Sequence, residues 1–305
     1  MPKTWITWLS AKAPQLALMV ITLIWGGTFL TVQYGLNFSS PLFFVGCRFA
    51  AATCALGLLS IKEMQGLNYK EIVAGSLIGV MIVLGYGTQT VGLQSISSSE
   101  SAILTALYVP LVPLLLWLIF HKKPHIMTGL GVIFAFIGLM LLTGNGFNQI
   151  AFNWGQTLTL LGAMAIALEI ILIGYFAGQV NLRRVTVIQL AVAALLAFAA
   201  MPLVGEHHLP DFSWMLVLTA GGLGLASALI QWVMNWAQRS VDPSQAAIIY
   251  AGEPVWAALI GRIAGERLPL MALYGGLMVV MAMILSEWKP RFLQKKLKTH
   301  QKEFD

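Results

Sequence analysis

The chain has 305 residues, of which 58% are hydrophobic and only 10% are charged. An ordinary soluble domain carries about 25% charged residues, so this composition leaves too little polar surface to cover a globule of this size in water. The net charge of +6 does not indicate nucleic-acid binding, because the basic residues are confined to short segments between long apolar runs.

These apolar runs are long enough to cross a lipid bilayer. A transmembrane helix needs about 20 apolar residues to cross ~30 Å of hydrocarbon, and the runs are too long and too continuous to be barrel strands. The sequence therefore predicts an all-α membrane protein with ten transmembrane helices. In chain order the runs cover residues 14–33, 41–60, 71–92, 101–120, 126–143, 155–178, 185–203, 213–236, 244–263 and 268–286.

The basic residues fall on one side of these helices. If the N-terminus is inside, fifteen of the 18 Lys and Arg residues lie in inside segments or in the C-terminal tail. The outside loops carry only Arg262 and Arg267, and Arg48 lies within a span. Basic loops stay in the cytoplasm, so both termini are predicted to be cytoplasmic.

The second half of the chain repeats the first at an offset of 144 residues. The segment "LQSISSSESAIL" (93–104) aligns with "AQRSVDPSQAAI" (237–248), and Pro110 then aligns with Pro254. Five spans are an odd number, so the second half would enter the membrane in the opposite direction, as in many secondary transporters. We predict a first repeat at 1–149, a second repeat at 150–288, and a basic cytoplasmic tail at 289–305.

The two matching prolines, Pro110 and Pro254, predict interruptions in the fourth and ninth spans. Proline removes one backbone donor and frees the carbonyl about four residues earlier, and a freed carbonyl in lipid needs a new partner. Interrupted helices at matching points of two repeats indicate a substrate site near the bilayer midplane. Tyr108 and Tyr250 flank these prolines, and we expect them to line that site.

Polar side chains also recur at helical spacing on the third and eighth spans. Tyr86 and Gln89 lie one turn apart, and so do Gln231 and Asn235, so each pair lies on one helix face. Such a face meets either a cavity or another helix, and the pattern alone is compatible with both. The residues predicted to line the substrate site are Tyr86, Gln89, Tyr108, Gln231, Asn235 and Tyr250.

Glu253 lies ten residues after Pro243, which places it about 15 Å along the ninth helix, at the bilayer centre. A charged side chain there costs ~2.5–3.5 kcal/mol when it faces lipid, so it should face a cavity or a partner, or be protonated. Two interpretations follow. Glu253 either binds a substrate ammonium or couples transport to protons, or it hydrogen-bonds backbone groups freed nearby and so fixes the ninth helix.

Two further charged residues lie inside predicted spans. Glu169 stands alone in the sixth span, where it could pair with a base from another helix or reach a cavity. Arg48 is expected to reach out of the membrane or to pair with an acid such as Glu100. The residues predicted to take part in coupling or gating are Glu253, Pro254, Pro110 and Glu169.

The segments "LIWGGTFLTVQYGLNFSSPLFFVGCRFAAA" (23–52) and "YAGEPVWAALIGRIAGERLPLMALYGG" (250–276) resemble the EamA family of the drug/metabolite transporter (DMT) superfamily. The resemblance extends over nearly the whole chain. It implies a ten-helix carrier of the bacterial inner membrane, often an exporter of amino acids or related metabolites, with Trp25 as an aromatic wall of the site. Its most specific pieces are Trp25-Gly26, Pro41 with Arg48, and Glu253-Pro254 with Gly265-Glu266-Arg267.

The chain departs from the pattern of that family at two points. The first-half counterpart of the segment Gly265-Glu266-Arg267 is "HKKP", residues 121–124, which lacks the acid. Glu169 stands where the sixth helix of such proteins is usually apolar or aromatic. The substrate therefore cannot be carried over from the family.

We expect a secondary transporter that exports small metabolites, such as amino acids or their analogues, by alternating access. A passive channel or facilitator, or a flippase for lipid-linked substrates, would use the same helix bundle and remains the alternative. The sequence has no metalloprotease, nucleophile-elbow or P-loop motif, so we expect no enzyme, no cofactor, no metal and no nucleotide site. The expected partners are a small-molecule substrate and the bilayer, with protons as the candidate coupling ion.

Overall fold

The computed structural model describes residues 3–121, 126–142, 153–265 and 270–287, and within these ranges the chain is helical with short connections and no strand. Eight helical stretches in this part of the chain are long and apolar enough to cross a membrane. Two shorter apolar stretches accompany them, Gly129–Gly138 and Leu273–Ala282. The prediction of a helical, multi-pass membrane protein is confirmed.

Most of the helices are continuous, and two of the spans are interrupted. Continuous helices are α1 (Lys3–Gly35), α2 (Pro41–Leu59), α3 (Tyr69–Gly92), α6 (Ile126–Leu142), α7 (Trp154–Phe176), α8 (Leu182–Ala200), α9 (Trp214–Ala237) and α12 (Leu270–Glu287). The turn η2 (Met201–Val204) extends α8. Two spans are each split into two segments: α4 (Ser98–Thr105) with α5 (Tyr108–Phe120), and α10 (Pro243–Tyr250) with α11 (Gly252–Ile263).

Both split spans break just before a proline. Pro110 is the third residue of α5, and Pro254 is the third residue of α11. Because proline cannot donate to the carbonyl four residues earlier, the regular helix stops there, and each break falls three to four residues before its proline. The first segments, α4 and α10, are both 8 residues long. The interruptions predicted at Pro110 and Pro254 are therefore present.

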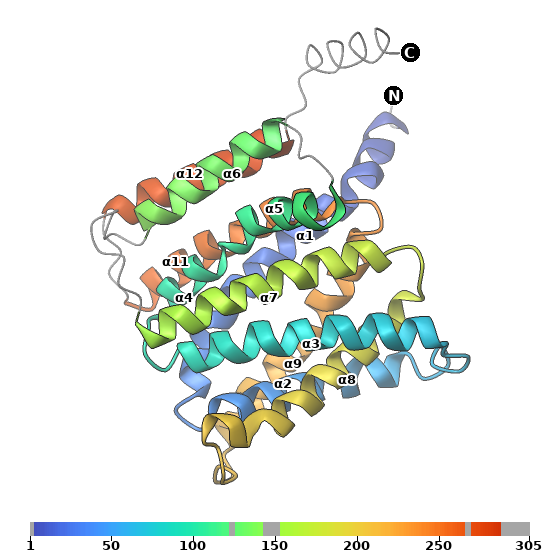
Figure 1. Ribbon diagram of the computed structural model, residues 1–305, viewed down its shortest axis with the longest axis vertical. Coiled ribbons are helices and arrows are strands. Elements are labelled where there is room, and N and C mark those ends of the chain that lie inside the picture. Colours follow the sequence, from blue (N-terminus) through green and yellow to red (C-terminus); the bar gives the residue numbers. More distant parts are fainter. Residues whose placement is uncertain (1–2, 122–125, 143–152, 266–269, 288–305) are drawn as a thin grey trace, which may run out of the picture.

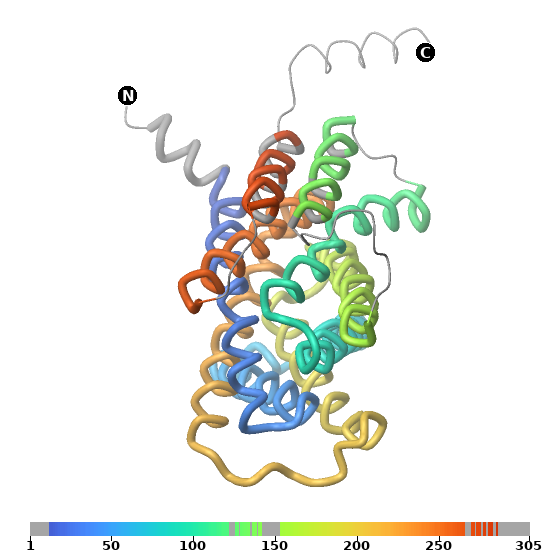
Figure 2. Tube along the Cα trace, turned by 90° about the vertical axis from the view of Figure 1, so that its left-hand side faces the viewer, coloured from blue at the N-terminus to red at the C-terminus, as the bar shows by residue number. Residues whose placement is uncertain are grey.

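The helices are arranged in two similar groups (Figure 1). α3 packs between α7 and α8, and α9 packs between α1 and α2. The second segment of each split span packs against the first segment of the other, α5 against α10 and α11 against α4. α6 and α12 form a pair along one edge of the bundle, and Figure 2 shows this pair beside the upper part of α1.

Glycines bring two of these helix pairs into backbone contact. A Cβ on Gly26 of α1 would lie 2.7 Å from the Cβ of Trp256 and 2.8 Å from the backbone oxygen of Glu253 in α11. A Cβ on Gly224 of α9 would lie 2.7 Å from the backbone oxygen of Arg48 in α2. Small residues permit such close packing in membranes. The backbones that carry Glu253 and Arg48 are thereby held directly against neighbouring helices.

Two carboxylates hold helix N-termini at opposite ends of the bundle. Glu206, in the connection before α9, accepts from the backbone N–H groups of Leu42 (2.8 Å) and Phe43 (3.1 Å) at the start of α2. Glu71, in the first turn of α3, accepts from the backbone N–H of Asn181 (3.1 Å) at the start of α8. Negative charge at a helix N-terminus is stabilising, so each contact fixes the beginning of one helix.

Candidate functional site

Three of the predicted aromatic residues meet in the centre of the bundle. Trp25 of α1 stacks on Tyr86 of α3 with ring centroids 6.2 Å apart, and it meets Tyr250 of α10 edge-on at 5.6 Å. Phe49 of α2, which the sequence analysis did not single out, lies edge-on against Tyr86 at 5.4 Å. All four rings are buried. We call Trp25, Tyr86, Tyr250 and Phe49 the aromatic cluster.

Glu253 lies where the two split spans face each other. It is the second residue of α11, and its Oε2 accepts a hydrogen bond from the hydroxyl of Tyr108, the first residue of α5, at 3.2 Å. Its side chain is fully buried, and its Oε1 has no hydrogen-bond partner in the described part of the chain. Among the described contacts the partner of Glu253 is therefore the Tyr108 side chain and not a backbone group.

Glu169 of α7 begins a chain of buried amides. Gln231 donates from Nε2 to Glu169 Oε1 at 2.7 Å, and Gln189 donates from Nε2 to Gln231 Oε1 at 2.7 Å. Asn235 donates from Nδ2 to Gln189 Oε1 at 3.3 Å and to the backbone oxygen of Gln231 at 2.9 Å. The other oxygen of Glu169 is buried without a partner among the described residues. Glu169 is therefore bonded to an amide, and of its two expected environments the pairing with a base is not seen in the described part of the chain.

Arg48 is buried and points into the bundle. Its Nε donates to Ser227 Oγ of α9 at 2.7 Å, and its guanidinium lies 5.1 Å from the ring centre of Tyr86 and 5.5 Å from that of Phe49. The expected ion pair with Glu100 is wrong, because α2 turns Arg48 towards α9 while Glu100 accepts a hydrogen bond from Gln156 of α7.

The remaining predicted residues have structural contacts of their own. Gln89 donates from Nε2 to Thr105 Oγ1 at 2.8 Å, which ties α3 to the end of α4. Pro110 and Pro254 are buried beside the helix breaks. Gln238, at the end of α9, donates from Nε2 to the hydroxyl of Tyr250 at 3.3 Å.

Gln189 is the main polar residue that the sequence analysis missed. It is fully buried in α8 and joins the two amides of α9. A signal was present, because an uncharged amide inside the apolar run 185–203 needs a partner away from lipid. Thr186 lies one turn earlier on the same side of α8, but no polar residue follows Gln189 in that helix, so the pattern is short.

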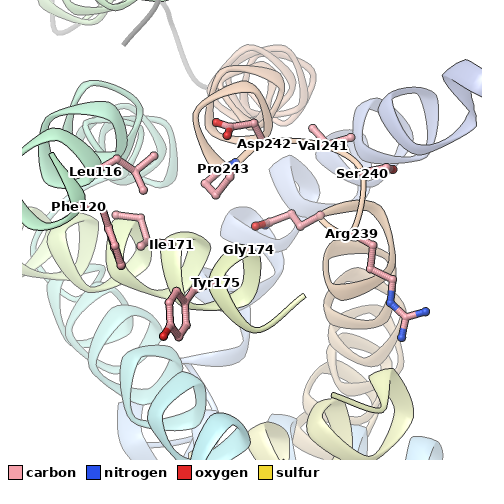
Figure 3. Close-up of a pocket in the computed structure, with 11 residues that line it drawn as sticks. Leu116, Phe120, Ile171, Gly174, Tyr175, Arg239, Ser240, Val241, Asp242 and Pro243 are labelled. Carbon is pink, nitrogen blue, oxygen red and sulfur yellow. The ribbon is translucent and has the colours of Figure 1, made fainter. Parts of the chain in front are cut away.

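A cavity of about 390 Å³ opens beside this central region (Figure 3). It lies where the connection between α9 and α10 meets the ends of α5 and α7. Gln238 is one of the lining residues, and it is hydrogen-bonded to the hydroxyl of Tyr250. The structure thus places a cavity of mixed polar and apolar lining next to the aromatic cluster.

Comparisons with known proteins agree with this architecture. The model of the EamA-like transporter family matches residues 13–144 and again residues 153–288. A protein of Archaeoglobus fulgidus named as an uncharacterized transporter is 29% identical over 273 residues, covering 88% of this chain and 84% of that protein. The Escherichia coli protein named as the uncharacterized inner membrane transporter YedA is 27% identical over 278 residues, covering 88% and 89%.

One solved structure shares the fold. A crystal structure titled only as that of a protein superposes with a TM-score of 0.72 at 16% sequence identity, covering 90% of this chain and 98% of the other. At this level of identity the likeness concerns the fold alone.

Proposed function

The chain belongs to the EamA-like transporter family, and from that premise we propose that it is a secondary transporter that exports small metabolites, such as amino acids or their analogues, by alternating access. The observation that carries the proposal is the buried carboxylate of Glu253. It lies where two split helices face each other and has one oxygen without a partner among the described residues. In a membrane such a group needs a proton or a ligand, and broken helices of this kind form the binding sites of many carriers.

Alternating access requires two halves that can exchange conformations, and we propose ten spans in two inverted repeats of five. Three findings support this. The family model matches the chain twice, α4 and α10 have the same length of 8 residues, and the helix pairs of one half recur in the other. Two similar units that face opposite ways can open first to one side of the membrane and then to the other.

The charges of the proposed substrate site are complementary to those of a small zwitterion. The free oxygen of Glu253 would accept a hydrogen bond from the ammonium group of the ligand. The positive charge of Arg48, which lies against the face of Tyr86, would attract the anionic group. Trp25 and Tyr250 offer apolar and polarisable surface to the rest of the molecule. The lining would comprise Trp25, Tyr86, Gln89, Tyr108, Gln231, Asn235 and Tyr250, with Glu253, Pro254, Pro110 and Glu169 in coupling or gating.

We also propose that the protein resides in a bacterial inner membrane with both termini in the cytoplasm. The YedA relative is named as an inner membrane protein. The start of α1 and the end of α12 lie on the same side of the bundle in Figure 1. The distribution of Lys and Arg along the sequence assigns that side to the cytoplasm.

The test is uptake of labelled amino acids into proteoliposomes, with and without a pH gradient, for the wild type and for Glu253→Gln. We expect gradient-driven, saturable flux in the wild type and its loss in Glu253→Gln. Glu63→Gln serves as the matched control, because Glu63 pairs with Arg183 at a partly exposed site and surface pairs contribute little. Wild-type flux that does not saturate and shows no counterflow would identify a channel in place of a carrier.

A further inference from the structure

The cavity beside Gln238 has one apolar side and one polar side (Figure 3). Leu116 and Phe120 of α5 and Ile171 of α7 form the apolar side, and the ring of Phe120 stacks on Tyr175 at 5.7 Å. The connection from α9 to α10 forms the other side. At about 390 Å³ the cavity falls within the ~300–1,000 Å³ that small-molecule sites occupy.

The polar side of the cavity presents hydrogen-bond acceptors. Gln238 is only 4% exposed, and its Oε1 is buried without a partner among the described residues, although its Nε2 is bonded to Tyr250. A buried amide oxygen left without a donor is unfavourable, and a ligand donor would relieve that cost. Asp242 adds a carboxylate, of which Oδ1 accepts from the backbone N–H of Ser244 at 2.9 Å. The guanidinium of Arg239 points away from the other labelled side chains in Figure 3.

We propose that this cavity is a binding site for a small primary ammonium compound with an apolar substituent. The ammonium group has three donors, which would bond the carboxylate of Asp242 and, once the Gln238 side chain turns into the cavity, its Oε1. The substituent lies against Leu116, Phe120 and Ile171. This site is separate from the one at Glu253, and its role as the place where substrate enters from the cytoplasm rests on the proposed function.

The position of the cavity links it to the central region through two contacts. Gln238 donates to the hydroxyl of Tyr250, and the ring of Tyr250 lies edge-on against Trp25. A ligand donor that bonds Gln238 Oε1 would therefore act on the same amide that holds Tyr250. Gly174 keeps α7 close at this point, because a Cβ there would lie 2.4 Å from Pro243 Cγ and 3.2 Å from Gln238 Oε1.

Binding is tested without reference to transport, by protection of an introduced thiol in the full-length protein in nanodiscs. Cys47 and Cys54 are first replaced by serine, and Ser240→Cys then places a thiol in the cavity lining. We expect saturating phenylalanine, leucine or phenethylamine to slow alkylation by a maleimide about fivefold or more. The reason is that the thiol reacts only in the small fraction of protein whose site is empty. N-Acetylphenylalanine, which lacks the ammonium group, should give no protection.

Variants and a control make the result specific. Lys62→Cys, on the exposed connection after α2 and outside the cavity lining, should be alkylated at the same rate with and without each probe. Asp242→Asn keeps an N-cap side chain and should raise the probe concentration needed for half protection about tenfold, the effect of losing one charged contact. Gln238→Leu should abolish protection in protein that still elutes as a monodisperse species.

The outcomes separate this inference from the proposed function. Absence of protection by all three ammonium compounds, or equal protection by N-acetylphenylalanine, overturns the binding site, and flux in proteoliposomes would then still support a transporter. Protection of Ser240→Cys in a protein without saturable flux would retain the site and remove the proposed function.

Discussion

The contact between α1 and α11 leads to a quantitative prediction for Gly26→Ala. The added Cβ would lie 2.7 Å from the Cβ of Trp256, 2.8 Å from the backbone oxygen of Glu253 and 2.9 Å from the backbone nitrogen of Ala257. Two of these atoms belong to the backbone of α11, so rotation of a side chain cannot relieve the clash. The two helices must move apart by several tenths of an ångström or more.

The neighbouring Gly27 provides the matched control. A Cβ at Gly27 would lie 3.5 Å from Ile260 Cδ1, which is an ordinary contact. Both substitutions gain the roughly 0.5–1 kcal/mol by which alanine is favoured over glycine within a helix, so this gain cancels in the comparison. Overpacking costs about 1–3 kcal/mol, and we expect Gly26→Ala to be less stable than Gly27→Ala by that amount.

The assay is reversible unfolding in mixed micelles, followed by flux measurements on the same preparations. Displacement of α11 also moves Glu253 relative to Tyr108, whose hydrogen bond is already 3.2 Å long, so flux should fall in Gly26→Ala and persist in Gly27→Ala. Equal stability of the two variants would refute the reasoning, because it would mean that α1 and α11 are not in backbone contact.

Two further predictions concern polar contacts. Gln231→Ala removes the donor to Glu169 Oε1; we expect it to lower flux at an unchanged level of protein in the membrane, measured by immunoblotting, and unchanged flux would leave the amide chain with a packing role only. Glu206→Ala removes the acceptor at the start of α2 and should cost about 0.5–2 kcal/mol, the usual range for losing a helix cap. The exposed neighbour His207 gives the control His207→Ala, and equal unfolding free energies for the two variants would show that the capping contact contributes nothing.

The sequence was most informative where one residue acts on its own backbone. Pro110 and Pro254 remove particular hydrogen bonds, so the breaks between α4 and α5 and between α10 and α11 could be placed from the sequence. The lengths of the apolar runs likewise predicted the helices, because the thickness of the bilayer sets the length of a span. Neither inference requires knowledge of the neighbouring helices.

Partners across helices could not be predicted in the same way. Opposite charge makes Glu100 a possible partner for Arg48 in the sequence, but the rotation of α2 directs Arg48 to Ser227. The partner of Glu169 is Gln231, an uncharged side chain on a helix distant in sequence. Which helix faces which is decided by the packing of the whole bundle, and the sequence of a single span carries little information about it.

The burial of the central residues has a consequence for the temperature dependence of flux. Trp25 and Tyr250 are at most 1% exposed, and Glu253 is fully buried. A molecule dissolved in water can reach them only after the helices around them part, and that step breaks packed contacts whose loss is individually small and collectively large. The rate of flux through such a protein should therefore rise with temperature far more steeply than diffusion through an open, water-filled pore. The temperature of the membrane should control how fast substrate is carried.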